Sequence, residues 1–349
     1  MNILYLYTDL MGYQIPIFKE YVNKYKSAVH VVYWDHEKKT PYKPPLFDNI
    51  SYYKRSSFKK RQLIDFVSDL NPAIVYIAGW MDKDYLSAVK TLRKRGVPVV
   101  SGFDDIWCGT LRQWVASWLF PLVKDMYFSH AWVAGPYQYE FAKNLGFKNN
   151  QIIFNCLSAD LEIFNKSYDM TNEAKAKQYP HRFLYAGRFK PIKGVDLLVT
   201  AWEKIEAQKK DWELCMIGNG ALCDEMTKHA GIIVKDFMQP EQLVDEIGKC
   251  GCFILPSRKD QWGLVLHEFS AAGLPIICSD ACGAAPVFVI PKFNGYIFRS
   301  HDVKSLESKL LSIINSSDHE LSIMSENSHK CGQKISPEMS AASFMSILD

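Results

Sequence analysis

One charged loop of this sequence and the helix expected after it carry two carboxylates, and carboxylates are side chains that bind sugar hydroxyls. Asp260 and Glu268 are eight residues apart, the first in the loop and the second inside a helix that Gly263 is expected to open. A carboxylate can accept two hydrogen bonds from a sugar diol. The first amides of a helix lack internal partners and lie at its positive end, so Gly263, Leu264 and Val265 suit a phosphate. An ordinary strand–helix unit with two solvated acids explains these residues equally well.

A second loop carries two cations between two glycines. An apolar strand is expected to end at Gly187 and a helix to begin at Gly194, so Arg188 and Lys193 project from one strand-to-helix loop. Two cations in such a loop can neutralise a diphosphate. Taken alone, the pattern also fits a solvated loop.

The elements around these loops alternate between strands and helices. In the first half, runs typical of strands are followed by stretches typical of helices. The strand runs are 3–7, 28–34, 73–78, 97–101, 130–134 and 151–154, and the helical stretches are 13–26, 58–70, 82–95, 110–126 and 136–146. Such alternation predicts a parallel sheet covered on both faces, with ligands at the carboxyl ends of its strands. A second alternation begins at Arg182, and the unpatterned residues 160–180 are interpreted as a linker.

The two loops together resemble the motifs of retaining glycosyltransferases of family 4, a group 1 family with the GT-B fold. Its signature is an acidic residue, seven others and a glutamate. The family usually has Glu first and Phe before the glycine, where this sequence has Asp260 and Trp262. The resemblance is specific over residues 182–300 and weaker over 1–155.

The resemblance implies an α/β protein of GT-B fold, with two Rossmann-like parallel-sheet domains that face a central cleft. Residues 1–165 would form the acceptor-side domain and residues 166–335 the domain that binds the nucleotide-sugar. Residues 336–349 would form a C-terminal helix that crosses back to the N-terminal domain.

The resemblance also implies the roles of single residues. Arg188 and Lys193 would hold the diphosphate of the donor, Asp260 would contact the donor sugar, and Glu268 would hold the ribose. Further positions are glycine turns, the helix start and a segment whose backbone meets the nucleobase. The donor-binding set is Gly12, Gly187, Gly218, Asn219, Phe237, Met238, Gly263, Leu264, Val265 and Glu268.

The strand end at 101–105 is the candidate acceptor side. The family commonly has His here, whereas this sequence has Phe103 followed by Asp104 and Asp105. Asp104 could receive the proton of the acceptor hydroxyl. An acid at this place could equally cap the next helix.

The implied reaction is transfer of a sugar, with retention, from a UDP- or GDP-sugar to a hydroxyl of a glycan or lipid-linked acceptor. It would need no metal and no cofactor besides this co-substrate, and it would serve surface polysaccharide or glycoconjugate synthesis. Two other classes stay open. One is a non-catalytic module that binds a nucleotide-sugar or a membrane. The other is a GT-B hydrolase or epimerase acting on a nucleotide-sugar.

Charge is unevenly distributed over the chain. The net charge is +3, but residues 1–165 hold 20 Lys and Arg against 15 Asp and Glu. The basic segment 38–61 includes Lys38, Lys39, Lys43, Lys54, Arg55, Lys59, Lys60 and Arg61. A solvated face, an acceptor-side patch or a membrane-facing patch explains this segment, and no nucleic-acid-binding motif accompanies it.

The cysteines and tryptophans of the sequence indicate the cellular compartment and a contact with a membrane. The nine cysteines form no CxxC pair, which favours a reducing, cytoplasmic setting. No apolar run reaches the roughly 18 residues of a membrane span. Residues 107–124 contain Trp107, Trp114 and Trp118 with Arg112 and Lys124. Such a helix suits peripheral contact with the inner face of a membrane, and a core helix is the alternative.

Overall fold

The computed structural model describes residues 1–35, 44–226, 229 and 231–348. The chain divides into two compact units, one of Met1–Ser158 with Ile335–Asp349 and the other of Ala159–Lys334. The division falls before residue 165, the limit expected from the sequence, because the helix that begins at Leu161 packs within the second unit.

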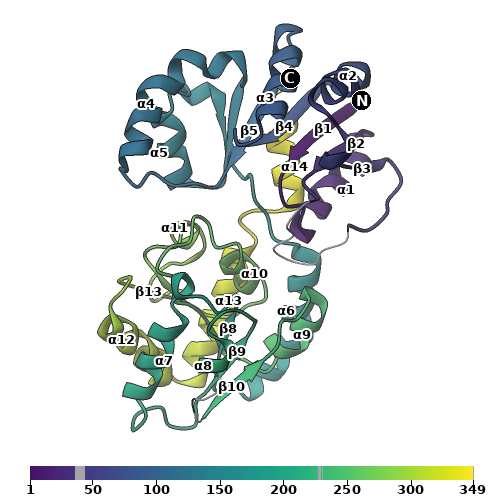
Figure 1. Cartoon of the computed structure of the whole chain (residues 1–349). Helices are drawn as coiled ribbons and strands as arrows, with labels where there is room; N and C mark the ends of the chain where they lie inside the picture. The colour runs from purple at the N-terminus through teal and green to yellow at the C-terminus, as the bar shows by residue number, and fades with distance from the viewer. Residues whose placement is uncertain (36–43, 227–228, 230, 349) are drawn as a thin grey trace. The chain divides into compact units, whose positions relative to one another are not determined.

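The first unit is built on a seven-stranded parallel sheet in the order β3-β2-β1-β4-β5-β6-β7 (Figure 1). The strands are β1 (Asn2–Tyr7), β2 (Ala28–Tyr33), β3 (Ile50–Lys54), β4 (Ile74–Ala78), β5 (Val99–Phe103), β6 (His130–Val133) and β7 (Ile152–Ile153). The helices are α1 (Ile15–Asn23), α2 (Lys60–Leu70), α3 (Lys83–Lys94), α4 (Leu111–Val123), α5 (Pro136–Asn144) and α14 (Pro337–Met345).

Apolar side chains fill both faces of this sheet. Successive residues of β1 alternate between two buried clusters, with Leu4 in one and Tyr5 in the other, as the two-residue period of a strand requires. The last helix completes the second cluster, because Phe344 of α14 lies 5.8 Å from the ring of Tyr5 and 5.0 Å from that of Trp132.

Strand β3 was not expected from the sequence, which placed no strand in the basic segment. Four of its five residues are polar or aromatic, and only Ile50 is buried. The strand lies at the edge of the sheet and pairs with β2 alone, so its burial pattern is weak. Lys38, Lys39 and Lys43 lie outside the described residues.

The second unit contains a six-stranded parallel sheet in the order β10-β9-β8-β11-β12-β13. Its strands are β8 (Arg182–Ala186), β9 (Glu213–Ile217), β10 (Ile232–Lys235), β11 (Cys252–Leu255), β12 (Ile276–Ser279) and β13 (Gly295–Phe298). Its helices are α6 (Leu161–Lys177), α7 (Val195–Lys204), α8 (Cys223–Met226), α9 (Pro240–Ile247), α10 (Val265–Ala271), α11 (Ala285–Phe288), α12 (Val303–Ile314) and α13 (Asp318–Gly332).

The predicted linker at 160–180 is wrong, because α6 occupies most of it. The buried side of α6 includes Phe164, Ser167 and Lys175, so small and polar residues stand where a periodic pattern would show apolar ones. Small side chains suit this helix because its neighbours come close: a Cβ on Gly248 would lie 2.9 Å from the Thr171 side chain.

Candidate functional site

The two motif loops lie side by side at the carboxyl edge of the second sheet. The sheet reverses its strand order between β8 and β11, which are hydrogen-bonded neighbours. The loop after β8 holds residues 187–194, and the loop after β11 holds residues 256–264. Open parallel sheets bind ligands at such a switch point, because the loops on its two sides diverge.

Lys193 and Asp260 join these loops through an ion pair. The Lys193 Nζ lies 2.6 Å from the Asp260 Oδ2, and both side chains are largely buried. The Ser257 hydroxyl donates a hydrogen bond to the same oxygen at 3.4 Å. The sequence had assigned the two residues separate roles, and the structure places the cation and the acid in direct contact.

Arg188 is the second cation of the site. Its side chain is exposed, and no hydrogen bond or ion pair of its guanidinium is found among the described residues. The loop around it is nevertheless fixed, because the Tyr185 hydroxyl donates to the Arg188 carbonyl at 2.9 Å. Burial raises the pKa of Tyr185, so this hydroxyl keeps its proton. Arg188 is therefore a positioned cation available to an external anion.

Glycines allow the loops of this edge to approach one another. A Cβ on Gly218 would lie 1.8 Å from the Gly187 carbonyl oxygen. The adjacent Asn219 carbonyl accepts a hydrogen bond from the Phe189 amide at 2.9 Å. The glycine turn after β9 is thereby joined to the cation loop after β8.

A second ion pair, between the loop after β11 and the first turn of α7, was missed in the sequence. Arg258 donates to both carboxylate oxygens of Asp196, at 2.7 and 2.6 Å, and these hydrogen bonds, with the charge of Arg258, lower the pKa of Asp196. The Arg258 amide also donates to the Ile192 carbonyl at 2.9 Å. The partners are 62 residues apart, so no local pattern could have linked them.

The turn before α10 differs slightly from the prediction. Gly263 does not open the helix, which begins at Val265 with Leu264 as the capping residue. Gly263 has a φ of +82°, a left-handed conformation that glycine adopts without strain. Among the described residues, the amides of Gly263, Leu264 and Val265 donate no hydrogen bond to the protein, so they remain available to an anion.

Glu268 lies half-buried in the first turn of α10. Burial, with a contribution from the charge of Asp160, raises its pKa to about 7. A carboxyl group with this pKa is half protonated at neutral pH, so it can donate or accept a hydrogen bond there.

The loop after β10 contains the residues expected beside the nucleobase. Phe237 is exposed and Met238 is partly exposed, in a loop without regular structure between β10 and α9. The Gly218 amide donates to the Lys235 carbonyl at 3.0 Å, so this loop leaves the sheet beside the glycine turn.

Gly12 and Asp104 belong to the first unit. Gly12 begins a short 3-10 helix (Gly12–Gln14) after β1, and Asp104 follows the end of β5. Phe103 is buried against Phe141, which accounts for an aromatic residue at this strand end. The proposed capping role for an acid here is wrong, because the Thr110 hydroxyl accepts from the Gln113 amide and caps α4.

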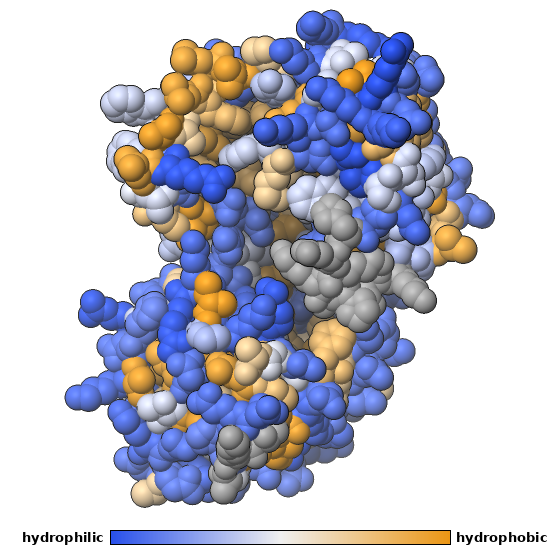
Figure 2. Space-filling model, viewed as in Figure 1, coloured by the Kyte–Doolittle hydropathy of each residue, from blue (hydrophilic) through white to orange (hydrophobic). Residues whose placement is uncertain are grey.

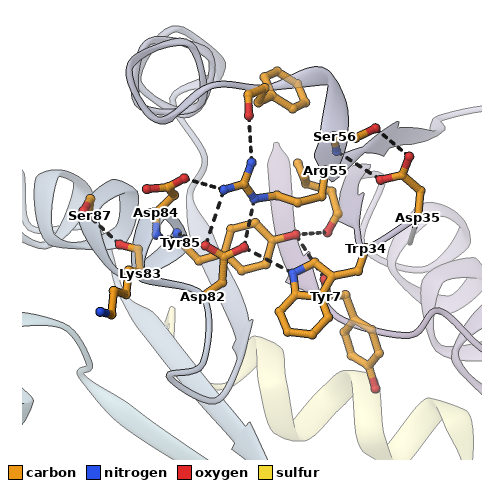
Figure 3. A network of polar contacts seen from close by, with 12 residues as sticks. Tyr7, Trp34, Asp35, Arg55, Ser56, Asp82, Lys83, Asp84, Tyr85 and Ser87 are labelled. Atoms are coloured by element: carbon orange, nitrogen blue, oxygen red, sulfur yellow. Dashed lines mark hydrogen bonds and ion pairs between the residues drawn. The ribbon is translucent and has the colours of Figure 1, made fainter. Parts of the chain in front are cut away.

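A network of polar contacts around one arginine lies at the carboxyl edge of the first sheet (Figure 3). Arg55, which follows β3, pairs with Asp82 at 2.9 Å and with Asp84 at 2.6 Å. Asp82 also caps α3 and accepts from the Trp34 indole at 3.2 Å. The hydrogen bonds of Arg55 lower the pKa of Asp82 despite its burial. Arg55 is thus bound internally rather than forming part of a solvated or anion-binding face.

The spacing of Asp82 and Asp84 is one at which two carboxylates can bind a divalent cation. In the structure both carboxylates face Arg55 instead. Within the ranges that the structure describes, no group of three or more His, Cys, Asp or Glu side chains could hold a metal ion.

Sequence comparisons match the second unit. Residues 169–332 match the family model of group 1 glycosyl transferases. An uncharacterized glycosyltransferase of Methanocaldococcus jannaschii is 29% identical over 164 residues, which cover 44% of each chain. The match thus spans about half or less of the length of the relatives found by sequence.

Structural comparisons match the whole chain. The Anabaena protein HepE, solved in complex with UDP and glucose, superposes with a TM-score of 0.72 over 99% of this chain and 98% of its own, at 13% identity. A glycosyltransferase from Rickettsia africae superposes with a TM-score of 0.73 over 99% and 97%, at 11% identity. The predicted architecture of two Rossmann-like parallel-sheet domains is confirmed. The chain has the GT-B fold, and its residues 169–332 match the group 1 glycosyltransferase family.

Proposed function

We propose that this protein transfers a sugar from a nucleotide-diphosphate donor to a hydroxyl of a glycan or lipid-linked acceptor. The observation that carries this proposal is the site at the β8–β11 switch point. There the exposed Arg188 adjoins the Lys193–Asp260 pair within the segment that matches the group 1 family. The complex of Anabaena HepE with UDP and glucose supports a UDP-sugar as the donor.

In the proposed mechanism, Arg188, Lys193 and the amides of 263–265 stabilise the leaving diphosphate. The bond between the anomeric carbon and the diphosphate oxygen breaks, and its electron pair stays on the diphosphate. The acceptor oxygen forms the new bond from the same face, with retention and without a metal. Its proton passes to the departing diphosphate, while Asp260 contacts the sugar and keeps Lys193 in place.

A panel of UDP, GDP, ADP and CDP tests the donor site by thermal shift. A ligand at about 100 times its dissociation constant adds roughly 2.7 kcal/mol of stability, which is a shift of a few degrees. We expect UDP or GDP to stabilise the wild type and the Lys190→Ala control, but not the Arg188→Ala/Lys193→Ala variant. A folded wild type that no nucleotide stabilises would contradict the donor site and favour a non-catalytic module.

Turnover separates the enzyme classes. The substrate is the nucleotide that binds, carrying glucose or another hexose on its diphosphate. A transferase releases the nucleotide from this substrate only when an acceptor alcohol is present. Release without any acceptor would indicate a hydrolase, and a changed sugar that stays attached would indicate an epimerase.

The raised pKa of Glu268 makes nucleotide binding depend on pH. In this proposal the carboxylate accepts hydrogen bonds from the two ribose hydroxyls, and its charged fraction rises from about a tenth at pH 6 to about nine tenths at pH 8, since the pKa is about 7. We therefore expect UDP affinity to rise up to about tenfold from pH 6 to pH 8 and then level off. Calorimetry should show this rise in the wild type and a flat profile in Glu268→Gln. A wild-type affinity that falls over this range would contradict the role of Glu268.

The membrane contact of α4 is proposed from its exposed side chains. The helix buries no residue completely, and six large apolar side chains share one helical stripe in contact with solvent. They are Leu111, Trp114, Val115, Trp118, Leu119 and Leu122. Figure 2 shows hydrophobic side chains gathered over the part of the surface where Figure 1 draws α4 and α5.

A lipid surface is the occupant that this stripe fits. Residues 106–124 contain no carboxylate, and tryptophans suit the interface between headgroups and acyl chains. Only Arg112 of the two expected cations faces solvent, because Lys124 is buried and paired with Asp125 at 2.6 Å.

No helix in the described part of the chain is both long and apolar enough to cross a bilayer. All nine cysteines are free thiols, which supports a reducing compartment.

Vesicle sedimentation tests this contact. We expect wild-type protein to bind vesicles of phosphatidylcholine and phosphatidylglycerol. The Trp118→Ser/Leu122→Ser variant should bind at least tenfold more weakly, because burial of each of these exposed side chains in the lipid contributes on the order of 2 kcal/mol. Ile323→Ser, an exposed position in the other unit, is the matched control. If the wild type does not bind vesicles but forms a dimer, and the double variant stays monomeric, the stripe binds a second copy of the chain instead.

A further inference from the structure

His267 is a buried histidine that the proposed mechanism does not use. It lies in α10 next to Glu268, and its ring is inaccessible to solvent. The ring stacks on Phe288 of α11, with centroids 4.4 Å apart and planes at 15°. A polar ring in such surroundings needs hydrogen-bond partners for both nitrogens.

Both ring nitrogens bind backbone groups far away in the sequence. The Ala159 amide donates to Nδ1 at 3.0 Å, and Nε2 lies 2.8 Å from the Gly332 carbonyl oxygen. An amide can only donate and a carbonyl can only accept, so Nδ1 is the acceptor and Nε2 carries the proton. The two partners therefore fix the neutral tautomer of His267.

These partners have a special place in the chain. Ala159 is the first residue of the second unit, and Gly332 lies just before Lys334, its last residue. The chain passes between the two units only next to these two positions. One imidazole ring thus holds the backbone beside both passages.

The helix that carries the ring and the turn that follows it are both fixed to α13. The Ser328 hydroxyl donates to the Leu274 carbonyl at 2.6 Å, and the Ser325 hydroxyl donates to the Gly273 carbonyl at 2.5 Å. A Cβ on Gly332 would lie 2.3 Å from the Ala271 amide nitrogen, so the helices touch there. Displacement of α10 would consequently displace the ends of both passages.

We propose that His267 is a positioning residue that ties both chain passages between the units to the helix carrying Glu268, so that a nucleotide bound at Glu268 restrains these passages. The restraint by nucleotide rests on the proposed donor site. The attachment of the passages to α10 rests on the two hydrogen bonds of the ring.

Hydrogen exchange without ligand tests the attachment. In His267→Phe, which keeps the ring stacking and removes both hydrogen bonds, we expect amides in 156–160 and 331–336 to exchange about tenfold faster than in the wild type. His267→Gln, which has one acceptor and one donor, should restore much of the protection. His329→Phe is the matched control, because the His329 ring stacks on Tyr168 and binds the Ala271 carbonyl, and none of the ring's hydrogen bonds reaches the described residues 156–160 or 331–336. Exchange within twofold of wild type at either segment in His267→Phe would overturn the attachment.

Exchange with saturating UDP or GDP tests the coupling. We expect the nucleotide to slow exchange of both segments in the wild type and in His267→Gln. It should not slow exchange in His267→Phe, even though the nucleotide affinity of this variant stays within about threefold of wild type. Equal slowing in His267→Phe would overturn the coupling. If neither nucleotide binds, the donor site and the coupling fail together, while the ligand-free comparison still decides the attachment. If His267→Phe does not fold, nitrogen-15 spectra of the wild-type ring decide instead: a proton on Nδ1 would contradict the attachment.

Discussion

Alanine at Arg188 or Lys193 is expected to lower the turnover number for sugar transfer by about 10²–10³-fold, as loss of one donor to a developing anion does in other enzymes. Both cations leave the same loop at the β8–β11 switch point, where a diphosphate would gain negative charge as the sugar departs. The double variant should lose little more than the stronger single one, because the two groups act on one leaving group.

The two single variants should differ in stability, and this difference tests the structure of the site. Arg188 has no internal partner among the described residues, so Arg188→Ala should leave the melting temperature unchanged. Lys193→Ala leaves the largely buried carboxylate of Asp260 without its cation and should cost on the order of 2 kcal/mol. Asp260→Asn in the Lys193→Ala background should recover part of this loss.

Steady-state kinetics and thermal unfolding measure these effects. Lys190→Ala, which removes an exposed cation of the same loop, is the control and should stay near wild type in both. Turnover that survives both single substitutions would contradict the assignment of this loop to the diphosphate. A drop in turnover of Lys190→Ala as large as theirs would show that general loop charge, rather than these two cations, is responsible.

Gly194→Ala is expected to lower the free energy of unfolding by about 3 kcal/mol or more and to impair nucleotide binding as well. Gly194 has a φ of +68°, and its added Cβ would lie 2.0 Å from the Pro256 carbonyl oxygen. The strain of a left-handed alanine costs about 1 kcal/mol. Contact with a backbone atom adds to it, because the loops after β8 and β11 must separate. That movement would also separate Lys193 from Asp260.

Gly231→Ala is the matched control for the backbone effect. Gly231 lies in the same unit with a φ of +81°, and its nearest neighbour would be the flexible end of Lys209 at 3.7 Å. It should therefore show the conformational strain alone, about 1 kcal/mol. Urea unfolding followed by tryptophan fluorescence, to which Trp202, Trp212 and Trp262 of this unit contribute, measures both losses. Equal losses in the two variants would show that the close approach at Gly194 contributes nothing.

The sequence by itself determined the two alternations of strands and helices and the loops in which the candidate site lies. Short apolar runs end where a strand leaves the sheet, so the positions of Gly187 and Leu255 already placed Arg188 and Asp260 at carboxyl ends. This information is local, because a strand end depends on a few neighbouring residues. It was weakest at the edge strand β3 and in α6, where partial burial or small side chains hide the apolar period.

Only the tertiary structure decided which of these residues meet. Lys193 and Asp260 are 67 residues apart, and the His267 ring joins backbone groups 108 and 65 residues away. No local pattern encodes such pairs, because they depend on the order of strands in the sheet. The same holds for α4: its apolar spacing is equally compatible with a core helix, and only the packed structure shows that this stripe faces solvent. Periodicity reveals that a face is apolar, whereas the surrounding elements decide what covers it.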